Sequence, residues 1–304
     1  MTHVPVMPEE VLAALHLRPG AFVVDGTVGH GGHARLMAAK IAPGGVILGL
    51  DWDLDMLATA KARLEGVEGV EVELRHTDYR GLPKALAEVA ASKRRAPYAD
   101  AILLDLGLNL AQIESPDRGI SFRVDAPLDM RMNRTSGEPA SALLNRASPE
   151  AIEDALFRFG DERWARRIAH VIVERRRTQP LRTTQDLVDC VLAAIPVAKR
   201  EKRIHPATRT FQAVRIWVNR ELDGLDEALA AAARCLAPRG VLAVLSFHSG
   251  EDRIVKHTFR DLAEKGFEEL YKKPLTPTES EIAVNPKSRS TKLRALRRTE
   301  EPQA

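Results

Sequence analysis

The chain has 304 residues, of which 44% are hydrophobic and 29% charged, and this composition excludes an intrinsically disordered or collagen-like protein. Two cysteines are too few for a disulfide framework or a four-thiolate zinc site. No apolar run approaches the roughly 18 residues of a membrane span, and the N-terminal MTHVPVMPEEVLAAL lacks the pattern of a signal peptide. We therefore predict a cytoplasmic protein with no membrane association and no metal site.

The formal net charge of +3 conceals an uneven distribution along the chain. Between Asp161 and Arg220 there are 14 basic and 6 acidic residues, a local charge of +8, and between Lys287 and Arg298 there are 6 basic residues and no acidic ones. The rest of the chain is therefore acidic. Two basic segments on an acidic body are typical of a protein with a polyanionic partner.

Strands and helices alternate in the first third of the chain. Strand patterns at 21–26, 46–51, 70–78 and 101–107 are separated by helical patterns that include 33–41 and 82–91. The fourth strand, AILLDLG, is almost entirely apolar, as expected of a strand buried on both faces. This alternation predicts an α/β fold with a parallel, doubly wound sheet.

The alternation stops for more than 100 residues and then resumes. A helix at 222–236, the strand VLAVLSF (241–247), a helix at 252–263 and an edge pair formed by GFEELYKK and STKLRALRR complete the predicted sheet. The block between is mostly helical, with an apolar stripe from Ala165 to Val173 and a capping box that begins at Thr183. We predict a core at 1–109 and 219–304 and an inserted helical domain for substrate recognition at 110–218.

A glycine-rich loop follows the first strand. It reads Asp25-Gly-Thr-Val-Gly-His-Gly-Gly-His-Ala, and its glycines let the backbone approach a ligand near the N–H groups of the next helix. Asp51 ends the second strand, where a carboxylate can accept both hydroxyls of a ribose. The spacing of Gly29, Gly31 and Ala34 also fits a loose dinucleotide fingerprint. The glycines alone therefore leave open an NAD(P) oxidoreductase, another nucleotide cofactor, or a tight turn with no ligand.

Charge at the ends of the strands favours one cofactor. Asp25 ends the first strand and Asp105 lies near the end of the fourth, so both are expected at the carboxyl edge of the sheet. These carboxylates would repel a pyrophosphate but attract the sulfonium and ammonium groups of S-adenosylmethionine. The sequence therefore favours S-adenosylmethionine over NAD(P).

Eight stretches, in one order along nearly the whole chain, carry a resemblance to a known family. They are HVPVMPEEVL (3–12), DGTVGHGGHARL (25–36), DLGLNLAQIESPDRGISF (105–122), PLDMRMN (127–133), GDERWARRIAHVIVERR (160–176), HPATRTFQAVRIWVNREL (205–222), SFHSGEDRIVK (246–256) and NPKSRSTKLRA (285–295). In these stretches the chain resembles the RsmH (MraW) family of ribosomal RNA cytosine-N4 methyltransferases. The resemblance implies a class I (Rossmann-like) S-adenosylmethionine methyltransferase fold with an inserted helical domain. It also implies N4-methylation of a cytidine in the decoding centre (P-site region) of 16S rRNA, within the small ribosomal subunit.

The resemblance also implies which residues bind the cofactor. By position these are Gly31, Gly32, His33, Asp51, Tyr79, Asp105 and Gln112. The strand-end and loop arguments add Asp25 and Gly29. Tyr79 stands where the family usually has Phe, which keeps an aromatic ring for the adenine.

The chain departs from the family pattern just after Asp105. Leu108-Asn109-Leu110-Ala111 stands where the family typically has Val-Ser-Ser-Pro, and Gly250 replaces a Leu. Two hydroxyl groups near the transfer site are therefore missing. This departure keeps open the alternative of a non-catalytic ribosome-assembly factor that retains the methyltransferase fold.

The expected reaction needs a hydrogen-bond acceptor for a poorly nucleophilic amine. The lone pair of the exocyclic amine of cytosine is delocalised into the ring, so holding the amine in line with the methyl group and accepting one N–H should promote transfer. Catalytic candidates are Asp105, Asn109 and backbone carbonyls of that loop. Methylation at carbon 5 would require a cysteine nucleophile, but Cys190 and Cys235 lie in apolar helical patterns and are predicted to be core residues.

Several basic and aromatic residues are predicted to bind the RNA, whose target base must be unstacked before it can react. The candidates are Arg118, Phe122, Arg123, Asp129, Arg131, His205, Arg209 and His248. His248 could instead cap the helix that follows it. Arg163, Arg166, Arg167 and His170 lie opposite the apolar stripe, where they are either RNA contacts or a solvated helix face, and Trp164 and Trp217 are predicted to be core residues. The sequence leaves a homodimer open.

Overall fold

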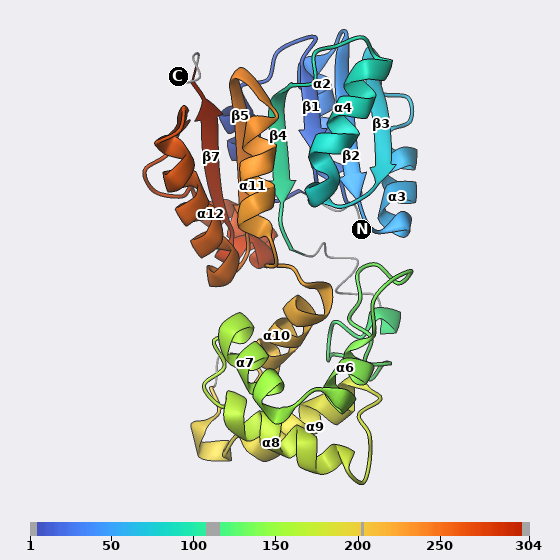
Figure 1. Cartoon of the computed structure of the whole chain (residues 1–304), viewed down its shortest axis with the longest axis vertical. Helices are drawn as coiled ribbons and strands as arrows, with labels where there is room; N and C mark the ends of the chain where they lie inside the picture. Colours follow the sequence, from blue (N-terminus) through green and yellow to red (C-terminus); the bar gives the residue numbers. More distant parts are fainter. Residues whose placement is uncertain (1–4, 108–115, 202–203, 300–304) are drawn as a thin grey trace. The chain divides into compact units, whose positions relative to one another are not determined.

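The computed structural model describes residues 5–107, 116–201 and 204–299, with the side chains of Pro116 and Lys287 excepted. The chain forms two compact units. The sheet unit comprises Met1–Gly107 and Gly224–Ala304, and the helical unit comprises Leu108–Asp223. Figure 1 shows both units with their labelled elements.

A seven-stranded sheet with the order β3-β2-β1-β4-β5-β7-β6 forms the centre of the sheet unit. Its strands are β1 (Phe22–Asp25), β2 (Gly45–Asp51), β3 (Val70–His76), β4 (Ala99–Asp105), β5 (Leu236–Ser246), β6 (Phe267–Glu269) and β7 (Lys292–Arg298). The first five strands pair in parallel, whereas β7 is antiparallel to both β5 and β6. The predicted parallel sheet and its closing edge pair are confirmed.

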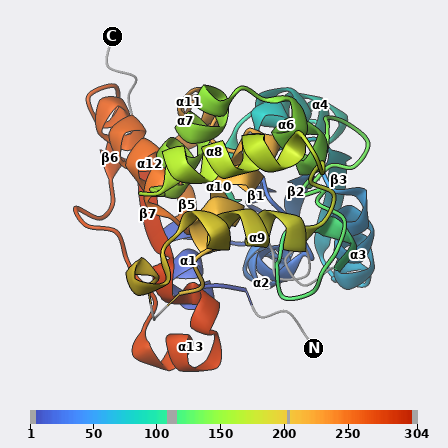
Figure 2. The same cartoon turned by 90° about the horizontal axis from the view of Figure 1, so that it is seen from below.

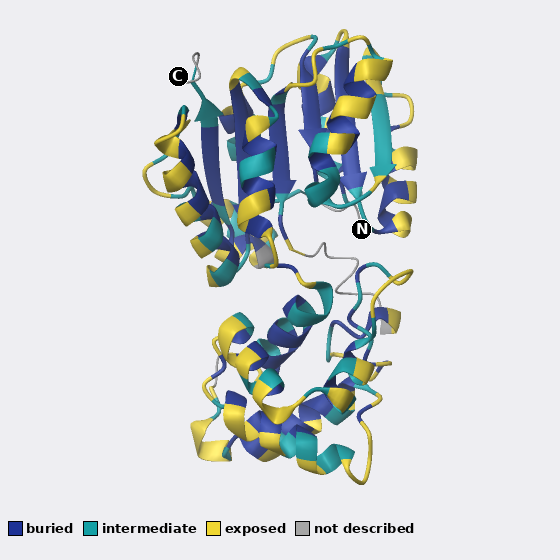
Figure 3. Cartoon of the chain, in the orientation of Figure 1, coloured by how far each residue is buried: buried dark blue, intermediate teal, exposed yellow. Residues whose placement is uncertain are grey.

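Helices cover both faces of this sheet, which explains why its central strands are apolar on both sides. The helices are α1 (Pro8–Leu15), α2 (Gly32–Ile41), α3 (Leu54–Leu64), α4 (Leu82–Ser92), α11 (Leu225–Arg234), α12 (Ser249–Ala263) and α13 (Glu279–Val284). Side chains of α1, α2 and α3 form one hydrophobic core with alternate residues of β1, β2, β4 and β5. Helices α4, α11 and α12 lie on the opposite face (Figure 1). In Figure 3 the central strands are buried along most of their length.

The helical unit has a hydrophobic core of its own. It contains α6 (Ala140–Arg146), α7 (Pro149–Gly160), α8 (Ala165–Arg176), α9 (Thr184–Ala194) and α10 (Thr208–Asn219). Figure 2 shows α8 and α9 side by side. Helix α7 ends at Gly160, where a Cβ would lie only 2.6 Å from the carbonyl oxygen of Arg209. Glycine at this position therefore permits the close approach of α7 and α10.

Local sequence signals place several helix ends correctly. The predicted capping box is present, since the Thr183 hydroxyl accepts a hydrogen bond from the Asp186 N–H and the Asp186 carboxylate accepts one from the Thr183 N–H. In contrast, the helix predicted at 252–263 begins three residues earlier, at Ser249, because the side chain of His248 acts as its N-cap. Within the described residues, no helix is both long and apolar enough to cross a membrane.

Half of the basic residues between Lys287 and Arg298 are ion-paired inside the sheet unit. Lys292 Nζ and Arg294 Nε lie 2.7 and 2.8 Å from the two carboxylate oxygens of Asp252, and Arg297 Nε lies 2.7 Å from Glu268 Oε1. Arg294 is buried. These side chains hold β7 against its neighbours, so this segment offers less free positive charge than its composition suggests.

Candidate active site

Three carboxylates lie side by side at the carboxyl edge of the sheet. Asp25, Asp51 and Asp105 are the last residues of β1, β2 and β4, and these strands are neighbours in the order β2-β1-β4. In an open α/β sheet, ligands bind in the crevice outside this edge. The structure therefore brings together the strand-end carboxylates that the sequence singled out.

The loop after β1 has the backbone conformation expected of a ligand-binding turn. Gly29 and Gly31 have φ angles of 49° and 75°, in the left-handed region that side chains other than glycine rarely adopt. The Gly29 N–H donates to Asp51 Oδ2 at 2.9 Å, and the Asp53 N–H donates to Oδ1 at 2.9 Å. Helix α2 starts immediately after Gly31 without a side-chain cap. The N–H groups of its first turn can therefore serve a ligand.

Asp105 has a fixed backbone and one carboxylate oxygen that accepts no hydrogen bond from the described residues. Its N–H donates to Thr27 Oγ1 at 2.6 Å, and its Oδ2 lies 3.7 Å from Nε2 of the buried His33. Oδ1 is buried and has no hydrogen-bond partner in the described parts of the chain, although a quarter of the side-chain surface is accessible. A buried acceptor without a partner is costly unless a ligand satisfies it. Our sequence analysis missed Thr27, and only its position inside the glycine loop could have indicated a role.

The three carboxyl groups are harder to ionise than ordinary aspartates. Burial raises the pKa of Asp25 to about 7, with a further contribution from the nearby Asp51. Burial likewise raises the pKa of Asp51 to about 6. It raises the pKa of Asp105 to about 8, where the negative charges of Asp25 and Glu251 add to the effect. A bound cation would relieve this repulsion, so the edge favours a positively charged ligand.

Glu251 is a second residue that our sequence analysis missed. Its side chain is almost fully buried, and its Oε2 accepts the Phe247 N–H at 2.8 Å. Its Oε1 lies 3.2 Å from Nε2 of His248, and the two residues form the capping box of α12. The structure thus places the predicted substrate residue His248 at the start of α12, paired with Glu251. The one available signal was the position of Glu251 three residues after a possible helix cap.

Tyr79 lies next to the glycine loop. It begins a short 3₁₀ helix (Tyr79–Gly81), and its Cβ would lie 3.5 Å from a Cβ built on Gly26. The guanidinium of Arg80 lies 4.9 Å from the centre of the Tyr79 ring and pairs with Asp78 at 2.6 Å. Tyr79 therefore stands beside the loop, and its contact with adenine stays a prediction.

Some predicted RNA contacts are engaged inside the helical unit. Arg118 is buried, and its Nη1 donates to the carbonyl oxygen of Met132 at 2.8 Å. Arg131 makes a bidentate ion pair with Asp129, with distances of 2.8 and 2.9 Å. These three residues form hydrogen bonds within residues 116–139, and an RNA contact for them stays a prediction.

Other predicted RNA contacts form an aromatic group. The ring of Phe122 lies 4.7 Å from that of the exposed His205 and 4.9 Å from that of Phe211. Arg209 Nη1 pairs with Glu201 at 2.9 Å. The structure thus brings Phe122 and His205 together from segments more than 80 residues apart.

Three predicted site residues are assigned neither to the sheet-edge site nor to the contacts within the helical unit. Arg123 is exposed. Asn109 and Gln112 lie outside the described residues, so the second catalytic candidate and one cofactor contact stay predictions.

Comparison with known proteins shows the family to which the chain belongs. The family model described as the MraW methylase family matches residues 1–299. The chain belongs to the MraW methylase family. Curated relatives named ribosomal RNA small subunit methyltransferase H include one from Geobacter sp. (strain M21), 44% identical over 97% of each chain. Another, from Syntrophotalea carbinolica, is 45% identical over 97% of this chain and 98% of its own length.

Family membership confirms the predicted S-adenosylmethionine-dependent methyltransferase. The strand order, with β7 antiparallel between β5 and β6, is that of class I methyltransferases, so the predicted fold is confirmed as well. The residues present fit this cofactor. The glycine turn leads into a helix without a side-chain cap, and the buried carboxylates suit a cationic ligand, since Oδ1 of Asp105 accepts no hydrogen bond from the described residues.

Proposed function

We propose that this protein methylates N4 of a specific cytidine in the decoding centre of 16S rRNA, with the small ribosomal subunit as its substrate and the cytoplasm as its location. Membership of the MraW methylase family and the names of the curated relatives support this proposal. The observation that carries the chemistry is the buried Oδ1 of Asp105 at the carboxyl edge of the sheet, which accepts no hydrogen bond from the described residues. A homodimer stays a prediction.

The glycine loop and the strand ends would hold the cofactor. Asp51 would receive the ribose hydroxyls, Tyr79 would stack on the adenine, and Asp25 and Asp105 would supply the negative charge that a sulfonium attracts. S-adenosylmethionine supplies a methyl group on a positively charged sulfur when bound. Asp25 is the least accessible of these carboxylates, 1% exposed, so its part is a fixed negative potential rather than direct contact.

Asp105 would act on the amine that receives the methyl group. As a carboxylate, its Oδ1 can accept one N–H of the exocyclic amine, which returns electron density to the nitrogen. The Thr27 hydroxyl fixes the Asp105 backbone, and the neighbouring His33 limits movement of Oδ2. Such positioning is worth up to about 7–11 kcal/mol of the barrier.

The proposal is tested by nucleoside analysis of 16S rRNA from a strain that lacks this protein. Digested rRNA is separated by chromatography alongside N4-methylcytidine and 5-methylcytidine standards and then measured by mass spectrometry. The separation is needed because the two isomers have the same mass. We expect N4-methylcytidine to disappear from one site and to return when the wild-type protein is restored. Its persistence in the deletion strain would refute the proposal.

A complementation experiment separates catalysis from assembly. The variant Asp105→Asn keeps the size of the side chain but removes its charge. A catalytic role predicts that this variant fails to restore the modified nucleoside although it is present at wild-type levels. Full restoration by Asp105→Asn would exclude the proposed role of Asp105. If small-subunit assembly depends on the protein while the modified nucleoside does not, the protein is an assembly factor and the enzymatic proposal fails.

A further inference from the structure

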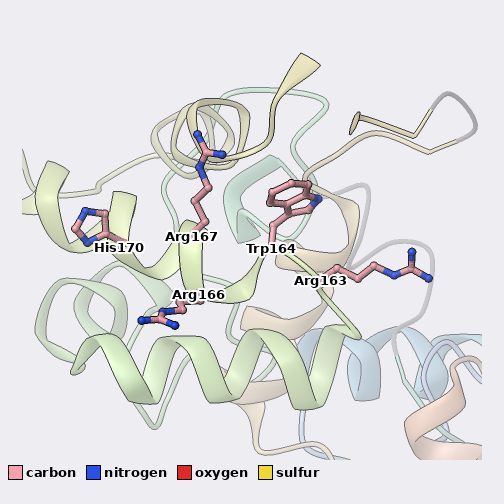
Figure 4. Close-up of a pocket in the computed structure, with 5 residues that line it drawn as sticks. All are labelled: Arg163, Trp164, Arg166, Arg167 and His170. Atoms are coloured by element: carbon pink, nitrogen blue, oxygen red, sulfur yellow. The ribbon is translucent and has the colours of Figure 1, made fainter. Parts of the chain in front are cut away.

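The N-terminal end of α8 presents a group of basic side chains around an indole ring. Arg163, Trp164, Arg166, Arg167 and His170 line a hollow of about 470 Å³ on the helical unit. We call these five residues the arginine face. Figure 4 shows the Trp164 indole between the side chains of Arg167 and Arg163 in this view. Four of the five residues are exposed, and Trp164 is partly buried against the core of the unit.

The three arginines of this face differ from the next arginines of the same helix. Arg175 pairs with Asp186 at 2.5 Å, Arg177 pairs with Glu174 at 2.8 Å, and Arg176 donates to two backbone carbonyls at the end of α6. In the described parts of the chain, the arginines of the arginine face have no ion pair or side-chain hydrogen bond. Three positive charges within five residues repel one another. Such a group is suited to a ligand with several negative charges.

The position of Trp164 makes the ligand more specific than a simple anion. Trp164 is the N-cap residue of α8, so the positive end of the helix dipole adds to the charge of the arginines. Part of the indole packs on the helical core while another part lines the hollow. A flat apolar ring among guanidinium groups is the combination by which proteins hold single-stranded nucleic acid, with bases stacked on aromatic rings and phosphates on arginines.

We propose that the arginine face binds a single-stranded segment of RNA, with phosphates on Arg163, Arg166 and Arg167 and one base against Trp164. The choice of RNA rests on the proposed function, in which the substrate is ribosomal RNA. Charge complementarity and the aromatic ring favour this occupant over an acidic peptide, which would use the charges but not the ring. The arginine face is thereby an RNA contact additional to Asp105, which is proposed to act on the reacting amine.

The test measures binding of a labelled 20-nucleotide single-stranded RNA over a series of salt concentrations. In the triple variant Arg163→Gln, Arg166→Gln, Arg167→Gln, the slope of log affinity against log salt should fall by about 2, because each phosphate contact contributes about 0.7 on single strands. Affinity should fall by at least about tenfold at moderate salt. Thermal unfolding verifies that the variant is folded.

A matched control removes the same charge from other exposed arginines of the helical unit. Arg146, Arg158 and Arg177 have side-chain exposures of 67%, 63% and 67% and are each ion-paired. Changing these three to Gln should leave the salt slope near the wild-type value. Equal losses in the two triple variants would mean that only the overall charge matters, which would overturn the proposal.

Substitutions of the indole test the stacking contact. Trp164→Phe retains an aromatic ring and should keep most of the affinity, whereas Trp164→Leu should lose about tenfold or more, as expected for one stacked base. Equal affinity of the two variants for the RNA would overturn the proposed stacking of a base on Trp164. Displacement of the RNA by an equally charged polyglutamate peptide at the same concentration would overturn RNA as the occupant, as would failure of the wild-type protein to bind the RNA.

These results are distinguishable from a failure of the proposed function. If the arginine-face variant binds RNA like the wild type while the wild type methylates 16S rRNA, the inference is wrong and the proposed function stands. If the wild type transfers no methyl group but the two triple variants differ in salt slope, the inference stands and the proposed function is wrong.

Discussion

Replacement of Asp25 by Asn tests the electrostatics of the sheet edge most directly. The Asp25 side chain is almost fully buried, and its Oδ1 accepts the Thr27 N–H at 3.2 Å. An asparagine has nearly the same shape and its amide oxygen can accept the same hydrogen bond, so the main change is the loss of a titratable group. Any difference in pH dependence between the two proteins therefore reports the Asp25 carboxyl and its effect on the pKa of the neighbouring Asp105.

The sign and the size of the effect follow from the raised pKa. Burial raises the pKa of Asp25 from 3.8 to about 7, so between these values the folded state binds a proton that the unfolded state does not. The stability that this proton contributes is complete below pH 3.8 and is lost as the pH rises through 7. The full loss is about 4 kcal/mol, of which about 2.5 kcal/mol falls between pH 5 and pH 8.

Urea denaturation at pH 5, 6, 7 and 8 without cofactor measures this difference. The free energy of unfolding of Asp25→Asn, relative to the wild type, should rise by about 2.5 kcal/mol from pH 5 to pH 8. The dependence of the free energy on urea should stay the same if both proteins expose the same surface. Because the ionised carboxylate attracts a cation, S-adenosylmethionine should stabilise the wild type more than the variant at pH 8. Parallel stability curves for the two proteins across this pH range would refute the reasoning.

Three further substitutions probe the site and the core. Asp105→Ala should leave the protein folded but reduce methyl transfer by about 100- to 1,000-fold. The kcat/KM of the wild type should rise with pH up to the pKa of Asp105, about 8, because the carboxylate is the proposed acceptor. Full activity of the variant or a flat pH profile would contradict this role. Gly31→Ala should lower the free energy of unfolding by about 1 kcal/mol, since Gly31 has a φ of 75°. Calorimetry should also show weaker binding of S-adenosylmethionine, and unchanged affinity would exclude the glycine turn from the cofactor site. Cys190→Ala should leave the transfer rate unchanged, because burial raises the pKa of the thiol to about 11 and keeps it neutral. The substitution should cost about 1 kcal/mol of stability. Loss of activity would point to cysteine-based chemistry.

The sequence alone predicted the elements that depend on local patterns. Strand-helix alternation indicated the parallel sheet, the apolar stripe indicated α8, and Thr183 and Asp186 marked the start of α9. The strand-end carboxylates Asp25 and Asp105 could also be placed at one edge before the structure was known, because parallel strands bring their carboxyl ends together. Spacing within one or two helical turns, or at the end of a strand, is sufficient for such predictions.

Only the tertiary structure decided which polar side chains are engaged and which remain available. Thr27 and Asp105 are 78 positions apart, and Asp252 and Arg294 are 42 apart, yet each pair is joined by a hydrogen bond. No local pattern carries this information, because such partners meet only through the strand order and the packing of helices. The same arginine-rich composition thus yields the buried, ion-paired Arg294 and the exposed arginine face of α8. What the sequence determined was the position of charge along the chain, and the fold decided which of these charges are ion-paired and which are exposed.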